Sequence, residues 1–516
     1  MKRFAALLLL LLPGSAGFQP APADPGHVNF KNPSGKWIDQ FGQNNTKNWP
    51  EKIKTIAQLK HFDQDECADL SSHHVPADRD EYQAWRTGPQ LNGSGFFRLE
   101  KYKDRWWFVA PNGHLFYSAG IDCVGAGAHT RINEKTNASC IWLPDRNSEF
   151  RAAFKDEAFS FYICNLIRKW GAGWKPKFVD RAVQRSKSWG FTCIANWSDD
   201  EFNKVRLPYC STGPACWELK NLDYIDGDIA DAFDPHFEKE VLRVASSLAK
   251  NKNDKYLLGY FVDNEMPWWN IPYDVLLLKS SSPCKIYWLD QLRAKYGSIE
   301  NLNKSWGIRA ANFDDVRWPG DKAPKAAQDD MTKFRGEFAE RFYDCWYRGI
   351  KAADPNHLVL GSRIPYPMDD VALACAKHTD VLSFNHYDYY LSKEFDRYYK
   401  LTDKAILIGE FDFDSVDAGL LSAFVPVKNQ KQRGAGYSFY AESAAAKPYI
   451  VGTHYFQYID EPLTGRGDGE TSFNGFVNVA DVPYKHLVNA ARETNLKIYE
   501  IHAGSRPATV KQPLAY

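Results

Sequence analysis

The sequence lacks several patterns that would each point to a class of protein. No CxxC pair occurs among its ten cysteines, and no HExxH-type spacing is present, so a zinc site is not expected. No strand-like run leads into a glycine-rich phosphate loop of the GxGxxG or GxxxxGK(S/T) type, which counts against a nucleotide cofactor. The GxSxG element of many serine hydrolases is missing as well. We therefore expect no cofactor and no catalytic metal, although the acidic stretch 465–470 is compatible with a structural cation.

An excess of charge of one sign is also lacking. Lysine and arginine together number 64, and so do aspartate and glutamate, which gives a formal net charge of zero. This balance does not favour nucleic acid or an anionic membrane surface as a partner. Beyond the first residues, no run is long and apolar enough to span a bilayer. We predict a protein that binds neither nucleic acid nor membrane, and the sequence does not indicate its oligomeric state.

The first residues carry the pattern of an export signal. Lys2 and Arg3 supply a positive start, residues 5–12 form an unbroken apolar run, and residues 13–17 are mostly small. The run is too short to span a bilayer, although a retained apolar anchor is the alternative. We predict a signal peptide over residues 1–18 and a secreted or periplasmic protein.

Export would permit disulfides between the cysteines. Cys140, Cys210 and Cys216 lie in polar, loop-like stretches and are candidates for pairing, but spacing alone does not give connectivity. Five other cysteines stand among apolar residues and are expected to be buried thiols: Cys123, Cys164, Cys193, Cys345 and Cys375.

Two stretches precede the predicted catalytic domain. Residues 19–35 are rich in proline, glycine and alanine, which is typical of a flexible tether. Residues 36–95 are polar, with one helical stretch near residues 53–70 and no hydrophobic repeat that would form a separate domain. We predict that residues 19–95 form a linker and an extension that wraps the domain after it.

One catalytic domain is predicted over residues 96–505, followed by a tail at 506–516. It begins with a hairpin over residues 96–118. Short apolar runs then alternate with longer segments of helical period, which favours an α/β fold with a parallel sheet and, over this length, a (β/α)8 TIM barrel. Seven strands are expected at residues 114–124, 190–197, 256–265, 357–365, 380–388, 405–413 and 449–460. The eighth, third in order, is expected between residues 200 and 235.

Polar side chains gather at the carboxyl ends of these strands, where a barrel builds its active site. Glutamate forms turns poorly, so Glu265 and Glu410 at two of these ends are informative. Hydrolysis of a glycosidic bond needs one carboxyl group to protonate the leaving oxygen and one to attack or to activate water. We predict this pair, with a rim salt bridge as the alternative for either residue alone. The other polar residues at strand ends are Asp122, Asn196, Trp197, Asn264, Arg363, Asn385, His386, Tyr387 and Gln457.

Several residues near these ends are candidates for contact with a sugar. The Asn264 amide can hydrogen-bond a sugar 2-hydroxyl. His386 or Tyr387 can hydrogen-bond the Glu410 carboxylate, although both are equally compatible with a packed interior. Flat rings suit sugar faces, and loop packing is the alternative for each of Trp197, Trp268, Trp269 and Phe456. We predict a substrate-binding set of Asp122, Asn196, Trp197, Asn264, Trp268, His386, Tyr387 and Gln457.

Long strings of the sequence resemble glycoside hydrolase family 50, the β-agarases, within the barrel clan of retaining glycosidases. GYFVDNEMPW at 259–268 is similar to that family's acid/base segment, and LIGEFDF at 407–413 resembles its nucleophile segment. Residues 455–484 resemble its final strand and the loop after it. Residues 105–124 and 37–53 resemble its entry into the first strand, so the resemblance spans residue 37 to about residue 500.

This resemblance implies a secreted, retaining hydrolase of β-linked galactan of the agarose type, which acts by double displacement. It assigns Glu265 as the acid/base and Glu410 as the nucleophile. Family 50 agarases usually carry a β-sandwich domain before the barrel, and the stretch before this barrel is too short to hold one, so the substrate stays open. The alternatives are a carrageenan, a porphyran or a plain β-galactoside, or an inactive barrel that only binds carbohydrate.

Overall fold

The computed structural model describes residues 28–29, 34–225, 229–320, 322–420, 422–467, 469–471 and 474–509. The predicted signal peptide lies outside this part of the chain, and the predicted tail is described only as far as residue 509.

Eight parallel strands form the central sheet: β5 (Ser118–Ile121), β9 (Cys193–Ile194), β10 (Tyr209–Ser211), β13 (Leu257–Tyr260), β14 (Leu358–Val359), β15 (Leu382–Asn385), β16 (Ile406–Phe411) and β18 (Ile450–Tyr455). Their order around the sheet is β14-β13-β10-β9-β5-β18-β16-β15, with every neighbouring pair parallel. A parallel bridge between Ile364 and Phe384 joins the segment after β14 to β15 and closes the barrel. The predicted (β/α)8 TIM barrel is therefore confirmed.

All seven predicted strands are present, each within or overlapping its expected range. The third barrel strand is β10, inside the interval of residues 200–235. It has only three residues, and a register shift between Tyr209 and Cys210 interrupts its pairing with β13. A strand this short has no room for a clear hydrophobic pattern, which explains why the sequence gives its interval but not its position.

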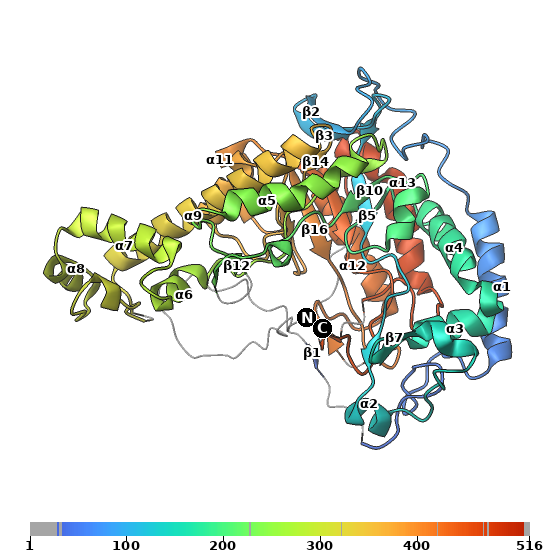
Figure 1. The fold of residues 1–516 in the computed structure, drawn as a ribbon. Helices are drawn as coiled ribbons and strands as arrows, with labels where there is room; N and C mark the ends of the chain where they lie inside the picture. Colours follow the sequence, from blue (N-terminus) through green and yellow to red (C-terminus); the bar gives the residue numbers. More distant parts are fainter. Residues whose placement is uncertain are drawn as a thin grey trace.

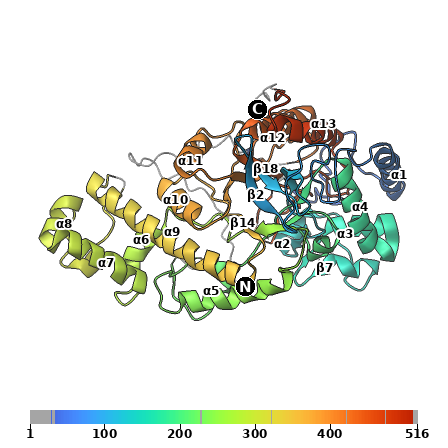
Figure 2. The ribbon, with the colours of Figure 1, turned by 90° about the horizontal axis from the view of Figure 1, so that it is seen from above.

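Helices surround the barrel on its outer face (Figures 1 and 2). Among them, α9 packs against α5 and α10, and α12 packs against α13 and β18. Their bounds are α3 (Phe161–Trp170), α4 (Trp174–Ser188), α5 (Phe237–Ala245), α9 (Lys325–Ala353), α10 (Asp369–Lys377), α11 (Glu394–Thr402), α12 (Gln430–Ala446) and α13 (Lys485–His502).

Three helices, α6 (Ile271–Leu277), α7 (Pro283–Tyr296) and α8 (Ile299–Trp306), project from the barrel together with the first half of α9 as an arm (Figure 1, left). The buried side chains of the arm continue the main apolar cluster of the barrel, and the ring of Trp288 stacks on Phe334 with centroids 4.4 Å apart. Buried Trp306 donates a hydrogen bond of 3.1 Å to Asp330. This insertion lies between β13 and β14 in the chain, and so lengthens one βα connection without disturbing the sheet.

A small antiparallel sheet of β2 (Arg98–Tyr102), β3 (Arg105–Val109) and β4 (Leu115–Phe116) precedes the first barrel strand, as the predicted hairpin requires. Its buried Phe108 and Phe116 share one apolar cluster with Leu358 and Val451, which lie where barrel strands begin. The hairpin therefore covers the amino-terminal end of the barrel and leaves the carboxyl end for the site.

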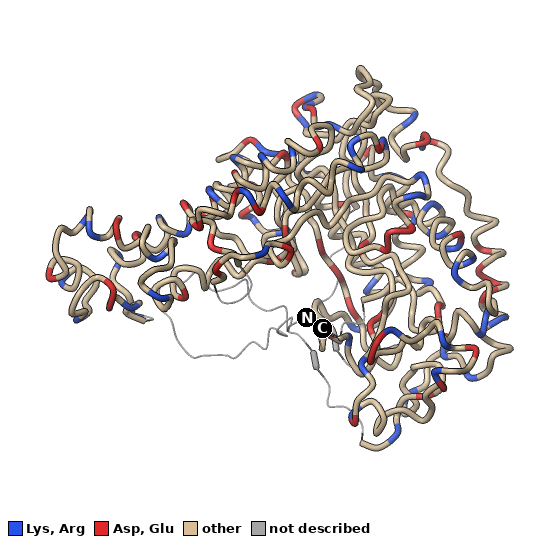
Figure 3. The backbone as a smooth tube through the Cα atoms, viewed as in Figure 1, with Lys and Arg blue, Asp and Glu red and all other residues tan. Residues whose placement is uncertain are grey.

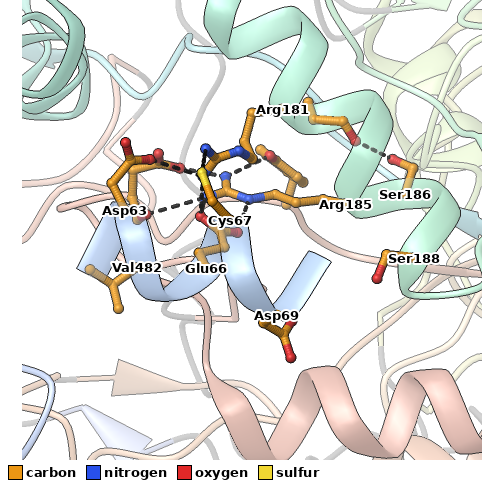
Figure 4. A network of polar contacts seen from close by, with 12 residues as sticks. Asp63, Glu66, Cys67, Asp69, Arg181, Arg185, Ser186, Ser188 and Val482 are labelled. Atoms are coloured by element: carbon orange, nitrogen blue, oxygen red, sulfur yellow. Dashed lines mark hydrogen bonds and ion pairs between the residues drawn. The ribbon is translucent and has the colours of Figure 1, made fainter. Parts of the chain in front are cut away.

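The segment before the barrel contributes helix α1 (Ile56–Ser72), which packs against α3 and α4. Glu66 of α1 accepts hydrogen bonds of 2.6 Å from Arg185 Nε and 2.7 Å from Arg181 Nη1, both in α4 (Figure 4). Arg185 also contacts Asp481, whose other oxygen accepts from Lys169 at 2.7 Å. These charges are almost fully buried and paired, so α1 is fixed to the barrel by a polar network rather than by a broad apolar face.

The remaining described elements are short. Strands β1 (Val28–Asn29) and β17 (Ser422–Ala423) pair with each other, as do β11 (Tyr224–Ile225) and β12 (Ile229–Ala230). Strands β6 (Thr130–Arg131), β7 (Phe154–Lys155) and β8 (Ala158–Phe159) form a three-stranded sheet beside helix α2 (Glu134–Ser139). Short 3₁₀ helices occupy Glu149–Ala153, Gly171–Gly173, Asp200–Lys204, Cys216–Glu218, Ser246–Asn251 and Phe313–Asp315.

The expected disulfide candidates do not pair. Cys140, Cys210 and Cys216 are all buried free thiols, and Cys210 Sγ lies 3.7 Å from Cys193 Sγ, too far for an S–S bond. These three side chains are therefore buried in the fold, although the sequence around them is polar and loop-like.

Basic and acidic side chains are intermixed along the chain trace (Figure 3). None of the described helices is both long enough and apolar enough to cross a membrane.

Candidate active site

The two predicted catalytic glutamates come from strands that face each other nearly across the barrel. Glu265 follows β13, and Glu410 is the second-last residue of β16. Two strands, β14 and β15, separate β13 from β16 on one side of the closed sheet, and four separate them on the other. Glu410 is 4% exposed, whereas Glu265 is half-buried. Both carboxyl groups therefore belong to the carboxyl end of the barrel, where parallel strands present side chains to one mouth.

Three donors hold the Glu410 carboxylate. Oε1 accepts from Nη2 of Arg363 and, at 3.4 Å, from Nε1 of Trp197. Oε2 accepts from the hydroxyl of Tyr387. The donors follow β14, β9 and β15, so three strands fix the orientation of one carboxylate.

Glu265 has a different environment. Its Oε1 accepts a hydrogen bond of 2.9 Å from Nδ2 of Asn385. Burial, and after it the negative charge of Glu410, raise the pKa of Glu265 to about 8, against the opposing influence of Asn385 and Arg363. The site thus combines a carboxyl that keeps its proton at neutral pH with one that is surrounded by donors, which is the arrangement that acid-assisted displacement requires.

Comparison with known proteins places this geometry in a family. A model described as β-galactosidase matches residues 230–412. The β-agarase B of Vibrio sp. (strain JT0107) is 33% identical over 90% of this chain, which spans 54% of that protein. The crystal structure of an agarase, AgWH50C, matches with a TM-score of 0.81 and 30% identity over 91% of this chain and 74% of its own. An exo-β-agarase structure matches with a TM-score of 0.82 and 28% identity over 92% and 73%.

The chain belongs to glycoside hydrolase family 50, the β-agarases. It spans about half the length of the curated agarases that it matches.

Asp122, Asn196 and Gln457 lie around the two glutamates of this family 50 barrel. Asp122 is fully buried, with Oδ2 3.4 Å from Nη2 of Arg363. Burial is the main influence on Asp122 and, with the charge of Glu410, raises its pKa well above the usual value, although Arg363 opposes this shift. Asn196 is also fully buried, and neither polar atom of its amide has a hydrogen-bond partner among the described residues. Gln457 is turned away, because its Nε2 donates to Glu461 at 2.9 Å.

Two residues of the predicted binding set face the protein interior of this agarase-family fold. Trp268 is 1% exposed and packs edge-on against Phe342, so its ring contacts α9 and is not a platform for a sugar. His386 Nδ1 lies 2.7 Å from the hydroxyl of Tyr440, and burial lowers the pKa of His386 to about 4. Of the two residues considered as partners for the nucleophile, Tyr387 makes the contact and His386 does not.

The other aromatic candidates of the family 50 barrel divide in the same way. Trp197 is half-buried and reaches Glu410, as described above. Trp269 is half-buried and meets Tyr366 edge-on. Phe456 is 6% exposed and packs edge-on against the ring of Tyr387, so its role is to support that residue.

Sequence reasoning gave no role to several polar groups that the family 50 fold brings to the mouth. Asp412 accepts a hydrogen bond of 2.8 Å from Asn474, and its charge acts on Tyr387. Arg466 contacts Glu461 at 2.9 Å and also Glu470, whose charge acts on Glu265. Asp412 stands two residues after Glu410. Because alternate residues of a strand point to the same face, this spacing could have identified Asp412 from the sequence. The others lie on the loop after β18, where sequence gives no periodicity.

The backbone at this end of the barrel is unusual. Five non-glycine residues just after barrel strands adopt left-handed conformations, with φ of +58° at Cys123, +61° at Trp197, +57° at Asp263, and +50° at Glu265 and Arg363. A left-handed residue turns its side chain away from the direction an extended strand would give it. Three of the five are residues that contact or form the catalytic pair.

Proposed function

We propose that the protein is a retaining hydrolase of β-linked galactan, in which Glu265 is the general acid/base and Glu410 is the nucleophile. The observation that carries this proposal is the difference between the two carboxyl groups. Glu410 has three donors on its two oxygens, whereas Glu265 has a pKa of about 8 and so holds a proton to give to a leaving group.

The first half of the proposed reaction forms a covalent intermediate. Glu410 attacks the anomeric carbon while Glu265 transfers its proton to the glycosidic oxygen, and the C–O bond to the leaving sugar breaks. Arg363, Trp197 and Tyr387 hold the attacking carboxylate in place. In the second half, Glu265, now ionised, takes a proton from water as the water displaces Glu410 from the same face. Two inversions at one carbon give net retention.

Substrate contacts are proposed for Asn264, Asn196 and Trp197. The Oδ1 atom of Asn264 is occupied by Arg363 Nε at 2.9 Å, which directs the Nδ2 group to the other side, where a sugar 2-hydroxyl can accept from it. Asn196 offers a buried amide with unsatisfied donors and acceptors beside Trp197. Both features suit the recognition of hydroxyl groups.

Paired arginines at the mouth favour a neutral galactan such as agarose over a sulfated one. Arg363 contacts Glu410 and Asp122, and Arg466 contacts Glu461 and Glu470. A sulfate group on the substrate would have to compete with these carboxylates for each guanidinium group. The similarity to proteins described as β-agarases supports the same choice.

A reducing-sugar assay on agarose, porphyran, carrageenan and an aryl β-galactoside tests the proposed function. We expect activity on agarose, and a loss of at least about 10³-fold in Glu410→Ala, since the nucleophile is removed. Azide should restore part of the activity of this variant on an activated aryl glycoside. Retained activity in folded Glu410→Ala would refute the assignment, and binding of a galactan without hydrolysis of any of the four substrates by the wild-type protein would identify an inactive binding barrel.

Proton NMR of the earliest product tests the double displacement separately. Retention requires carboxyl groups about 5 Å apart, whereas inversion requires roughly 6.5–9.5 Å to seat a water. We expect the β-anomer to appear first, before mutarotation. An initial α-anomer would contradict the proposed mechanism even if both glutamates proved essential.

A further inference from the structure

A continuous chain of side chains joins the two glutamates. Arg363 donates from Nη2 to Glu410 and from Nε to Oδ1 of Asn264 at 2.9 Å. The same Oδ1 accepts from Nδ2 of Asn385 at 3.2 Å, and that Nδ2 also donates to Glu265 at 2.9 Å. No step in this chain is longer than an ordinary hydrogen bond.

Strand order explains how the chain is built. The glutamates come from β13 and β16, and the connecting Arg363 and Asn385 come from β14 and β15, the two strands between them. In the register of β15 and β16, Asn385 pairs directly with Glu410. Asn385 and Glu410 are strand residues, and Asn264, Glu265 and Arg363 lie in the segments that follow β13 and β14 at the same end of the sheet.

Arg363 is the only member of this chain with a positive charge, and it is completely buried. Its Nη2 lies between Glu410 and Asp122, which is also completely buried, at 3.4 Å from the latter. A buried guanidinium group without a carboxylate partner is strongly unfavourable, so Asp122 gives Arg363 a second carboxylate contact besides Glu410. This contact gives Asp122 a role as a partner of Arg363 in place of a sugar ligand.

We propose that Arg363 is a positioning residue that couples both catalytic glutamates, directly through Glu410 and through Asn264 and Asn385 to Glu265. This inference rests on the proposed function. Arg363 acts on Glu410 as a charged hydrogen-bond donor and on Glu265 through its positive charge, whereas Asn385 acts on Glu265 as a hydrogen-bond donor.

Other titratable groups also face this chain. They act on it through their charges. They are Asp122 and Cys123 after β5, Tyr387 after β15, Asp412 after β16, His454 in β18 and Glu470 after β18. Asp122 loses its ion-pair partner when Arg363 is replaced by Gln but keeps a positive charge beside it in Arg363→Lys, which is therefore the control for that loss.

The pH dependence of kcat/KM separates this coupling from a merely structural role. In Arg363→Gln, Glu265 loses a nearby positive charge and Glu410 loses a hydrogen-bond donor, so the alkaline limb should move to higher pH and kcat should fall about 10²-fold or more. In Asn385→Ala, Glu265 loses its donor while Glu410 keeps all three of its own, so the alkaline limb should move to higher pH with a smaller fall in kcat. In Arg363→Lys, the charge remains but the planar fork is lost, so the limbs should stay near those of wild type while kcat falls about 10²-fold.

The wild-type protein is assayed first on agarose, and its activity there decides the proposed function independently of Arg363. Given an active wild type, the coupling is overturned if folded Arg363→Gln keeps the alkaline limb in place, or if it moves that limb without a loss of kcat. If Arg363→Gln does not fold, Arg363→Lys and Asn385→Ala decide: an unmoved alkaline limb in the first and an alkaline limb at higher pH in the second support the coupling, and any other pattern refutes it.

Discussion

Nδ2 of Asn385 donates a hydrogen bond of 2.9 Å to Oε1 of Glu265. A bond of this kind favours the ionised carboxylate, yet the pKa of Glu265 is about 8. Burial and the neighbouring charge of Glu410 therefore outweigh the amide. The hydrogen bond orients the acid more than it sets its proton affinity.

The alkaline limb of the pH profile should report this balance. Glu265 must be protonated when the glycosidic bond breaks, so the rate should fall as pH rises through about 8. Glu265→Gln should remove the limb. It should also slow substrates with poor leaving groups far more than activated aryl glycosides, since only the former need the proton. Equal losses on both substrate types, measured as kcat/KM, would contradict the acid role.

Two tryptophans that look alike in the sequence should respond oppositely to truncation. Trp268→Ala empties a site in the core and should lower the free energy of unfolding by about 3–5 kcal/mol. Its kcat/KM, measured on folded protein at low temperature, should stay near that of wild type. Trp197→Ala removes a donor to Glu410 and should lower kcat/KM by about 10²-fold with a much smaller effect on stability.

Denaturant unfolding with parallel kinetics checks this pair. Trp197→Phe is the matched control, because it keeps an aromatic ring at this position while it removes the indole N–H group. If Trp268→Ala raised KM while the protein remained stable, the ring would have to contact substrate after all.

The buried network of α1 and α4 should make the protein sensitive to acid. Burial raises the pKa of Asp481, but the charges of Arg185 and Lys169 outweigh it and hold that pKa below the usual range. Its contribution to stability is therefore present above pH ~4, the value for an unfolded aspartate, and is lost as pH falls towards the lower folded value. Asp481→Asn should destabilise the fold by about 3–5 kcal/mol at pH 7, and this difference should shrink in acid.

Unfolding curves between pH 2 and pH 7 measure this effect. Asp403→Asn serves as the control, because Asp403 is exposed and its ion pair with Lys101 should be worth at most about 1 kcal/mol. A difference between wild type and Asp481→Asn that does not depend on pH would rule out the charge-based explanation.

We also propose that the protein is exported and cleaved. The charged start, apolar run and small residues near the amino terminus predict a mature chain that begins between about residue 16 and residue 24. Intact mass of protein recovered from the periplasm or the medium checks this. Full-length protein retained in the membrane fraction would favour the uncleaved anchor.

Much of this fold follows from pattern alone. Strands buried on both faces read as apolar runs, which is why seven of the eight were predicted, and Glu265 and Glu410 stood out because glutamate rarely ends a strand. The position of the third strand was not predicted, because a strand of three residues is too short to show a hydrophobic pattern. The arm within the connection from β13 to β14 was not predicted as a separate feature, since its helices have the same composition as those of the barrel.

The contacts within the site were less predictable than its location. His386 and Tyr387 are neighbours in the sequence, and either could have been predicted to contact Glu410. Successive residues of an extended segment point to opposite sides, so His386 contacts Tyr440 and Tyr387 contacts Glu410. Trp268 follows Glu265 closely in the sequence, but its ring packs against Phe342 of α9. Arg363 is a plain strand-end residue in the sequence, and only the closing of the barrel reveals what it joins.

The left-handed residues at the barrel mouth have a consequence for laboratory selection. A non-glycine residue in that conformation costs about 1 kcal/mol or more, so glycine or asparagine at Cys123, Trp197, Asp263, Glu265 or Arg363 would relieve local strain. A screen for heat tolerance alone would thus favour substitutions at positions that include three residues of the proposed site. Thermostable isolates from such a screen should be enriched in variants that have lost turnover, whereas selection on growth with galactan should keep Trp197, Glu265 and Arg363 unchanged.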